Sequence, residues 1–148
     1  MTKSSKLFLF PDINVWVALS YERHIHHTAA RNWFDTLEPT ARLFFCRFTQ
    51  LGLLRLLSAT AVMGVDQAKT QQQAWEAYDV WLEDERIELL DEPASLEEYF
   101  RRLTKSALPS PKDWADSYLA AFAQASRLTI VTFDRGFLAK ADELVLLR

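Results

Sequence analysis

The chain has 148 residues, of which 49% are hydrophobic and 25% charged, and its formal net charge is −3. This composition is typical of one soluble globular domain and argues against a disordered chain. The negative charge also argues against broad electrostatic binding of nucleic acid, although a nuclease with an acidic site needs only local basic residues.

The sequence gives no sign of export or membrane insertion. The apolar run after MTKSSK is too short for a signal peptide, because Pro11 interrupts it. No stretch approaches the ~18 apolar residues that a membrane span needs. The single cysteine, Cys46, cannot form an intramolecular disulfide and lies in the apolar run LFFC, so we expect a buried thiol in a reducing, cytoplasmic setting.

The predicted elements alternate between strands and helices along the chain. We predict strands at 7–10, 43–46, 87–90, 128–132 and 144–147, and helices at 13–19, 28–37, 48–57, 66–85, from 95 onward, and at 112–126. Pro11 is expected to end the first strand, Thr49 to cap its helix, and Ser95 to form a capping box with Glu98.

Strands that are joined by helical crossovers pair in parallel. We therefore predict an α/β fold, a three-layer α/β/α sandwich with a mostly parallel central sheet, over a single domain of residues 1–148.

Two of the predicted strands are followed by a carboxylate. Asp12 comes directly after Pro11, and Asp134 follows the fourth strand. The carboxyl ends of parallel strands meet at one edge of a sheet, where open α/β proteins bind their ligands. Aspartate is also common in turns and caps, so each residue alone has a purely structural interpretation.

Two further acids lie in the helix predicted at 112–126. Asp116 has mostly apolar neighbours, which predicts burial, and a buried carboxylate needs a cation, a donor or a metal. Lys112, four residues earlier, is the local candidate partner. Asp113 points the same way one turn before Asp116, but an exposed acid at a helix N-terminus explains it equally well.

Converging carboxylates repel one another unless a cation lies between them. Oxygen ligands without cysteine suit Mg²⁺ or Mn²⁺, which can lower the pKa of bound water and stabilise charge on a phosphate. The acids together therefore indicate phosphodiester hydrolysis. The motif His24-x-His26-His27 could suggest zinc, but a polar loop that leads into a helix is the preferred interpretation.

The chain resembles a PIN-domain ribonuclease of the VapC-like toxin group found in bacterial toxin–antitoxin pairs. The resemblance spans 7–137 and is carried by the motifs PDINVWVAL, HHTAARNWF, FTQLGLLRLL, DWADSYLAAFA and VTFDRGF. It implies an Mg²⁺- or Mn²⁺-dependent endoribonuclease with an RNA substrate and a cognate antitoxin. It implies the catalytic acids Asp12, Asp116 and Asp134, with Asp12 and Asp116 on the metal and Asn14 and Thr132 as polar support.

One position departs from the family pattern. Gln50 stands where the family usually has a glutamate, and an amide carries no charge for a metal. Asp113 is the candidate fourth acid in its place. The alternative function is then a catalytically weakened PIN-like domain that binds RNA or protein.

Other readings concern the surface and a different fold. Arg55 either contacts an RNA phosphate or is a solvated surface residue. The helices at 13–19 and 51–57 are expected to form an apolar groove that binds an antitoxin or a second copy of the chain in a homodimer. A receiver-type phosphoacceptor would need an acidic pair after the first strand and a lysine after the last, which this chain lacks.

Overall fold

Residues 8–148 are described by the computed structural model of this protein, and Leu7, where we expected the first strand to begin, lies outside that range. The described residues form a five-stranded sheet in the order β3-β2-β1-β4-β5, and all neighbouring strands are parallel. The strands are β1 Phe8–Pro11, β2 Arg42–Phe45, β3 Ile87–Leu89, β4 Thr129–Thr132 and β5 Leu144–Leu146. The predicted α/β fold with a parallel central sheet is confirmed.

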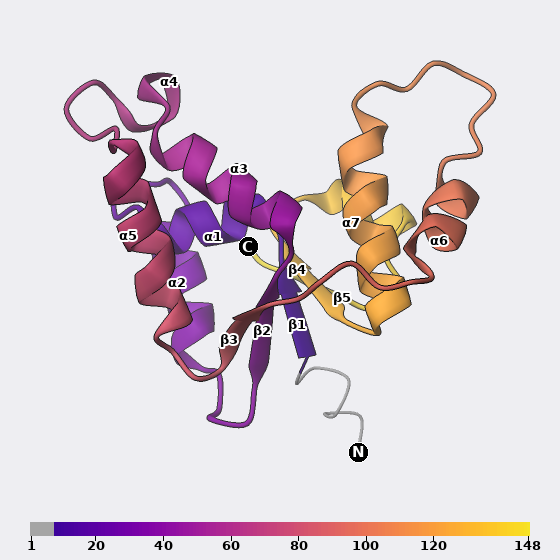
Figure 1. Cartoon of the computed structure of the whole chain (residues 1–148), viewed down its shortest axis with the longest axis horizontal. Helices are drawn as coiled ribbons and strands as arrows, with labels where there is room; N and C mark the ends of the chain where they lie inside the picture. The colour runs from indigo at the N-terminus through magenta and orange to yellow at the C-terminus, as the bar shows by residue number, and fades with distance from the viewer. Residues whose placement is uncertain (1–7) are drawn as a thin grey trace.

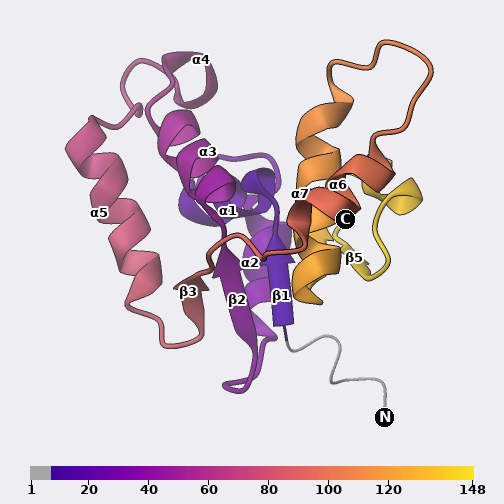
Figure 2. The same ribbon diagram turned by 45° about the vertical axis from the view of Figure 1, so that its right-hand side comes forward.

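Helices cover both faces of this sheet (Figure 1). One layer contains α1 Ile13–Ser20, α2 His27–Asp35, α3 Arg47–Leu57, the short α4 Thr60–Met63 and α5 Gln71–Leu82. The opposite layer contains α6 Leu96–Leu103 and α7 Asp113–Ser126, and Figure 2 shows the sheet between the two layers. A short 3-10 helix, η2 Arg135–Ala139, follows β4.

Each helical layer has its own hydrophobic core, because successive strand residues point to opposite faces of the sheet. Leu9 of β1 and Phe45 of β2 belong to the core under α1, α3 and α5, whereas Phe10 and Phe44 belong to the core under α7. Trp16 of α1 stacks on Phe45 with ring centroids 4.0 Å apart. Because both faces of the sheet are buried, the strands appear in the amino-acid sequence as short continuous apolar runs.

The starts of α3 and α5 differ from the predicted starts at 48 and 66. α3 begins at Arg47 with Cys46 as its N-cap, so Thr49 is not the N-cap residue. As the third helical residue, its hydroxyl accepts the Cys46 N–H (3.0 Å), which is one half of a capping box. α5 begins at Gln71 rather than at 66, because Thr70 and Gln73 form a capping box there.

Ser95 does precede α6, but its side chain caps nothing, and Glu98 pairs with Arg102 (3.0 Å) instead. The predicted capping box at this helix is therefore wrong. Pro11 is the last residue of β1 and stands in register with Val131, so the strand ends one residue later than predicted.

The start of α1 is held close to α3. Gly52 of α3 faces Ile13, and a Cβ at Gly52 would lie 2.7 Å from Ile13 Cγ1, too close for any larger residue without a shift. This contact fixes the beginning of α1, and with it Asp12, against the neighbouring helix. Among the described residues, no helix is both long and apolar enough to cross a bilayer.

Candidate active site

The carboxyl ends of β1 and β4 place Asp12 beside Thr132. These strands are neighbours, and the buried Thr132 hydroxyl donates to Asp12 Oδ2 over 2.5 Å. The same hydroxyl oxygen accepts the backbone N–H of Asp134 over 2.9 Å. One threonine side chain therefore connects two of the three predicted acids, as expected for residues at a shared sheet edge.

Asp12 is a buried carboxylate at the start of α1. It is 7% exposed, and its Oδ1 accepts the Val15 N–H over 3.2 Å as the N-cap of the helix. Burial raises the pKa of Asp12 to about 6, and the hydrogen bonds from Thr132 and the backbone offset only part of this rise. The nearby charge of Asp116 raises this pKa further, so the surroundings of Asp12 disfavour an unmatched negative charge.

Asp116 lies close enough to the other acids to interact with them electrostatically. Its pKa is raised by partial burial and then by the charge of Asp134, while Lys140 opposes the rise. Asp134 is exposed at the N-cap of η2, where its Oδ1 accepts the Gly136 N–H over 2.7 Å. The three predicted acids thus form one electrostatically connected group, centred on Asp116.

The first turn of α7 is more exposed than its sequence indicates. Trp114 is 57% exposed and Ala115 is also exposed, so the helix is buried only from Ser117 onward and Asp116 is half-buried. The predicted burial of Asp116 is therefore only partial, because the neighbouring residues in the first turn of α7 are exposed.

The cation near these acids is Lys140, which the sequence analysis missed. Its Nζ lies 2.6 Å from Asp113 Oδ1, whereas Lys112, the expected local partner of Asp116, is exposed. Asp113 is therefore already paired with Lys140, which argues against a role for Asp113 as the fourth acid of the site. Lys140 follows η2, far along the chain from α7, so no helical spacing signals the contact.

Gln50 has partners other than the acids. It is 5% exposed, and its Oε1 accepts from Arg47 Nη1 over 2.6 Å, while a hydrogen bond also joins it to Tyr78. Asn14 has an exposed side chain and reaches Asp12 through its backbone N–H, which lowers the pKa of Asp12. Arg55 is exposed in the last turn of α3 beside Leu51 and Trp75, away from the sheet edge.

The donor set at the edge suits a hard divalent cation. Within 8–148, no three acidic, histidine or cysteine side chains lie close enough to enclose a metal by themselves. Mg²⁺ does not need such a cage, because it commonly keeps several waters and binds one or two carboxylates. Asp12 and Asp116 fit this requirement, since each has a raised pKa and a cation would relieve their repulsion.

His24 and His26 lie in the loop between α1 and α2, His27 is the first residue of α2, and each of the three makes a contact. His24 Nδ1 accepts the His26 N–H over 3.0 Å, and His27 Nδ1 lies 2.7 Å from the Ala18 carbonyl oxygen. The His26 ring stacks on Phe133, with centroids 4.4 Å apart and planes 15° apart. These contacts favour the polar-loop interpretation over zinc, and they pack the loop against the residue between Thr132 and Asp134.

Replacing His26 with alanine is expected to lower the free energy of unfolding by about 1 kcal/mol, because an aromatic pair of this geometry contributes roughly that amount. A phenylalanine at position 26 keeps a flat ring and should retain most of the stability. Urea denaturation of the three proteins measures both effects. Equal losses in the two variants would show that the imidazole nitrogens, not the ring stack, stabilise the loop.

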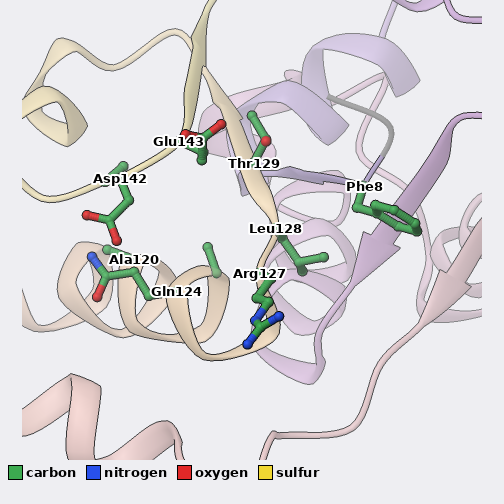
Figure 3. A pocket seen from close by; sticks show the side chains of 10 residues that line it. Phe8, Ala120, Gln124, Arg127, Leu128, Thr129, Asp142 and Glu143 are labelled. Atoms are coloured by element: carbon green, nitrogen blue, oxygen red, sulfur yellow. The ribbon is translucent and has the colours of Figure 1, made fainter. Parts of the chain in front are cut away.

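A separate cavity of about 430 Å³ lies at the opposite end of β4 (Figure 3). Its lining comes from the end of α7, the beginning of β4 and the segment before β5: Phe8, Ala120, Ala123, Gln124, Arg127, Leu128, Thr129, Ala141, Asp142 and Glu143. None of the predicted catalytic acids contributes to it. The edge that carries Asp12, Asp116 and Asp134 therefore remains the candidate active site.

Comparison with known proteins gives a family for this arrangement. Residues 9–143 match the PIN domain family. Ribonuclease VapC41 of Mycobacterium tuberculosis is 42% identical over 132 residues, which cover 87% of this chain and 90% of the relative. Ribonuclease VapC38 of the same species is 28% identical over 138 residues, with 89% of each chain covered.

Solved structures agree in fold. VapBC2 from Rickettsia felis, bound to a promoter DNA fragment, has a TM-score of 0.67 at 18% identity and covers 95% of this chain and 98% of its own. VapC20 of M. tuberculosis, a toxin that cleaves the sarcin-ricin loop, has a TM-score of 0.65 at 15% identity, with 95% and 99% covered. At such identities the likeness concerns the fold alone. The family match over most of the chain and the 42% identity to a VapC ribonuclease show that this protein belongs to the PIN-domain family, within its VapC group.

Proposed function

We propose that this protein is a divalent-metal-dependent endoribonuclease that acts as the toxin of a toxin–antitoxin pair. The observation that carries the proposal is the Thr132 hydroxyl, which joins Asp12 to Asp134 at the edge where Asp116 also contributes its charge. A ribonuclease that is 42% identical supports the same reaction here. We place the enzyme in the cytoplasm and assign residues 1–148 to a single PIN-like domain.

Asp12 and Asp116 would hold the Mg²⁺ or Mn²⁺ ion, and Asp134 completes the acidic group. The bound ion would supply a water of lowered pKa and charge stabilisation at the scissile phosphate. Thr132 fixes the orientation of the Asp12 carboxylate and of the Asp134 backbone, so neither must reorganise on binding. Lys140 partly offsets the negative charge that would otherwise repel an RNA phosphate.

The test is cleavage of ribosomal RNA by the purified protein with Mn²⁺ or Mg²⁺, and again with excess EDTA. Cleavage that depends on the ion supports the proposal, and cleavage that is equally fast in EDTA contradicts it. RNA binding without cleavage in either ion would favour the second candidate, a catalytically weakened domain. That candidate rests on Gln50, which brings no charge and is already bonded to Arg47 and Tyr78.

The partner surface differs from the expected groove. Residues 15–19 of α1 are buried in the core, so this helix cannot offer an apolar face, and the groove predicted between 13–19 and 51–57 is wrong. Two exposed apolar side chains, Leu51 of α3 (58% exposed) and Trp75 of α5 (47% exposed), instead line a cavity of about 630 Å³ between these helices.

Neighbouring structures are toxin–antitoxin complexes, and we propose that this chain likewise binds a small antitoxin that suppresses cleavage. A homodimer is the competing use of the same apolar surface. Light scattering of the protein alone detects a homodimer. Co-expression with the product of an adjacent small gene, followed by the cleavage assay, detects an antitoxin. If the two proteins form no complex and the cleavage activity is unchanged, the toxin role is contradicted.

A further inference from the structure

A large aromatic side chain at the start of α7 is left in solvent. Trp114 is 57% exposed, and it lines a cavity of about 430 Å³ together with the loop that joins α6 to α7 (Figure 1). Leu108, Pro109, Pro111 and Asp113 contribute to the same lining. Leu108 is 74% exposed, so the cavity presents two large apolar side chains that packing in the core does not explain.

Asp113 connects this cavity to the candidate active site. Its side chain lines the cavity beside Trp114, and its Oδ1 lies 2.6 Å from Lys140 Nζ. The charges of Asp113 and Lys140 both act on Asp116, the first raising its pKa and the second lowering it. The cavity thus begins at a residue that interacts electrostatically with the acids, and Lys140 offsets the carboxylate in its lining.

The Trp114 indole is held in place although most of it is exposed. Its ring makes an edge contact with Phe100 of α6, with centroids 6.0 Å apart and planes 73° apart, and Phe100 packs on the core under α7. The loop is restrained as well, because the Ser106 hydroxyl accepts the Leu108 N–H over 3.1 Å and two prolines fix φ in the same segment. A ring and a loop that are already ordered lose little entropy when a ligand binds.

The loop also supplies the charge that a nucleic acid requires. Residues 104–112 contain two lysines, Lys105 and Lys112, and no acid. Both lysines are exposed and form no ion pair with any residue within 8–148, whereas the two arginines at the end of α6 are paired with glutamates. A second copy of the chain would bring these like charges together across a twofold contact, which favours a polyanion over a homodimer at this surface.

We infer that this cavity is a nucleotide-binding subsite for single-stranded RNA, in which an unpaired base stacks on Trp114 and neighbouring phosphates contact Lys105 and Lys112. The inference rests on the RNA substrate of the proposed function. Stacking of bases on aromatic side chains, with basic residues along the backbone, is a general means by which proteins bind single-stranded RNA. A duplex keeps its bases inside the helix, so the subsite selects RNA that is unpaired next to the bond to be cleaved, as in a loop or bulge.

The experiment measures binding of a short fluorescein-labelled single-stranded RNA by fluorescence anisotropy in EDTA, where a metal-dependent nuclease is inactive. Trp114→Ala should bind about tenfold more weakly than the wild type, the loss expected for one stacked base. Trp114→Leu keeps an apolar contact with Phe100 but has no flat ring, so it should lose as much, and it serves as the test if alanine unfolds the protein. Trp114→Phe retains a flat ring and should lose less than either. The same RNA annealed to its complement should bind all four proteins equally.

Val80→Ala is the matched control, because Val80 is a similarly exposed apolar residue (62%) on α5, in the opposite helical layer. It should bind both RNAs with wild-type affinity. The inference is overturned if the Trp114 variants bind the single strand as tightly as the wild type does, or if they lose equal affinity for the single strand and the duplex. It is also overturned if light scattering shows a changed oligomeric mass in Trp114→Ala, since the ring would then contact protein.

Failure of the subsite and failure of the proposed function are distinguishable. Wild-type cleavage of ribosomal RNA with Mn²⁺, together with unchanged RNA affinity in Trp114→Ala, would reject the subsite alone. Selective loss of single-strand affinity in Trp114→Ala, without cleavage by the wild type in either ion, would support the subsite and reject the nuclease.

Discussion

Replacing Asp116 with asparagine is expected to reduce RNA cleavage by about a hundredfold to a thousandfold, the usual loss when one group that stabilises developing charge is removed. Asparagine has nearly the same shape but brings no charge to a cation. The fold should persist, because partial burial and the charge of Asp134 both raise the pKa of Asp116 and thus disfavour its carboxylate form. Cleavage of ribosomal RNA with Mn²⁺ under single-turnover conditions measures the rate.

Asp79→Asn supplies the control, since Asp79 is an exposed acid on α5 and its replacement changes the net charge equally. It should cleave at the wild-type rate. Thermal denaturation of both variants separates a loss of chemistry from a loss of fold. An Asp116→Asn protein that is unfolded, or one that cleaves as fast as the control, would show that Asp116 is not part of the catalytic group.

Replacing Asp12 with asparagine is expected to raise the free energy of unfolding in EDTA at pH 8 by as much as about 3 kcal/mol. The pKa of Asp12 rises from 3.8 to about 6 on folding, and each unit corresponds to about 1.4 kcal/mol. Asparagine is also a good N-cap and can accept the Thr132 hydrogen bond, so the local structure should survive. The gain reflects removal of a charge that is costly to bury.

The stability gain of Asp12→Asn over the wild type is expected to depend on pH. Because the folded state holds the Asp12 proton more tightly, the destabilising effect is absent below about pH 4, grows between pH 4 and 6, and is complete above pH 6. The advantage of Asp12→Asn should therefore vanish at pH 4. Urea denaturation of both proteins at pH 4 and pH 8 tests this, and a variant that is less stable at pH 8 would contradict it.

Mn²⁺ should reduce the stability advantage of Asp12→Asn over the wild type. A cation that binds the folded state stabilises it, and the wild type has one more carboxylate to offer. We therefore expect Mn²⁺ to raise the stability of the wild type at pH 8 more than that of Asp12→Asn. An equal rise in the two proteins would place the ion away from Asp12.

The layer architecture and the position of the two strand-end acids could be predicted from the sequence alone. Short apolar runs bounded by helices require a parallel sheet that is covered on both faces, and the end of a strand fixes where the next residue lies. Asp12 and Asp134 could therefore be placed at one edge without coordinates. The Thr70–Gln73 capping box was also encoded locally, although our prediction started that helix five residues too early.

The pairing of the side chains around those acids depends on the packing of the whole fold and could not be predicted from the sequence. Lys140 reaches Asp113 because η2 returns toward the first turn of α7, and Gln50 bonds to Tyr78 because α3 packs beside α5. The His26 ring stacks on Phe133 just beyond the end of β4, and the buried Ser117 hydroxyl is left without a hydrogen-bond partner among the described residues. These contacts join residues far apart in the chain, and no local periodicity encodes them, because they depend on how the helices pack on the sheet.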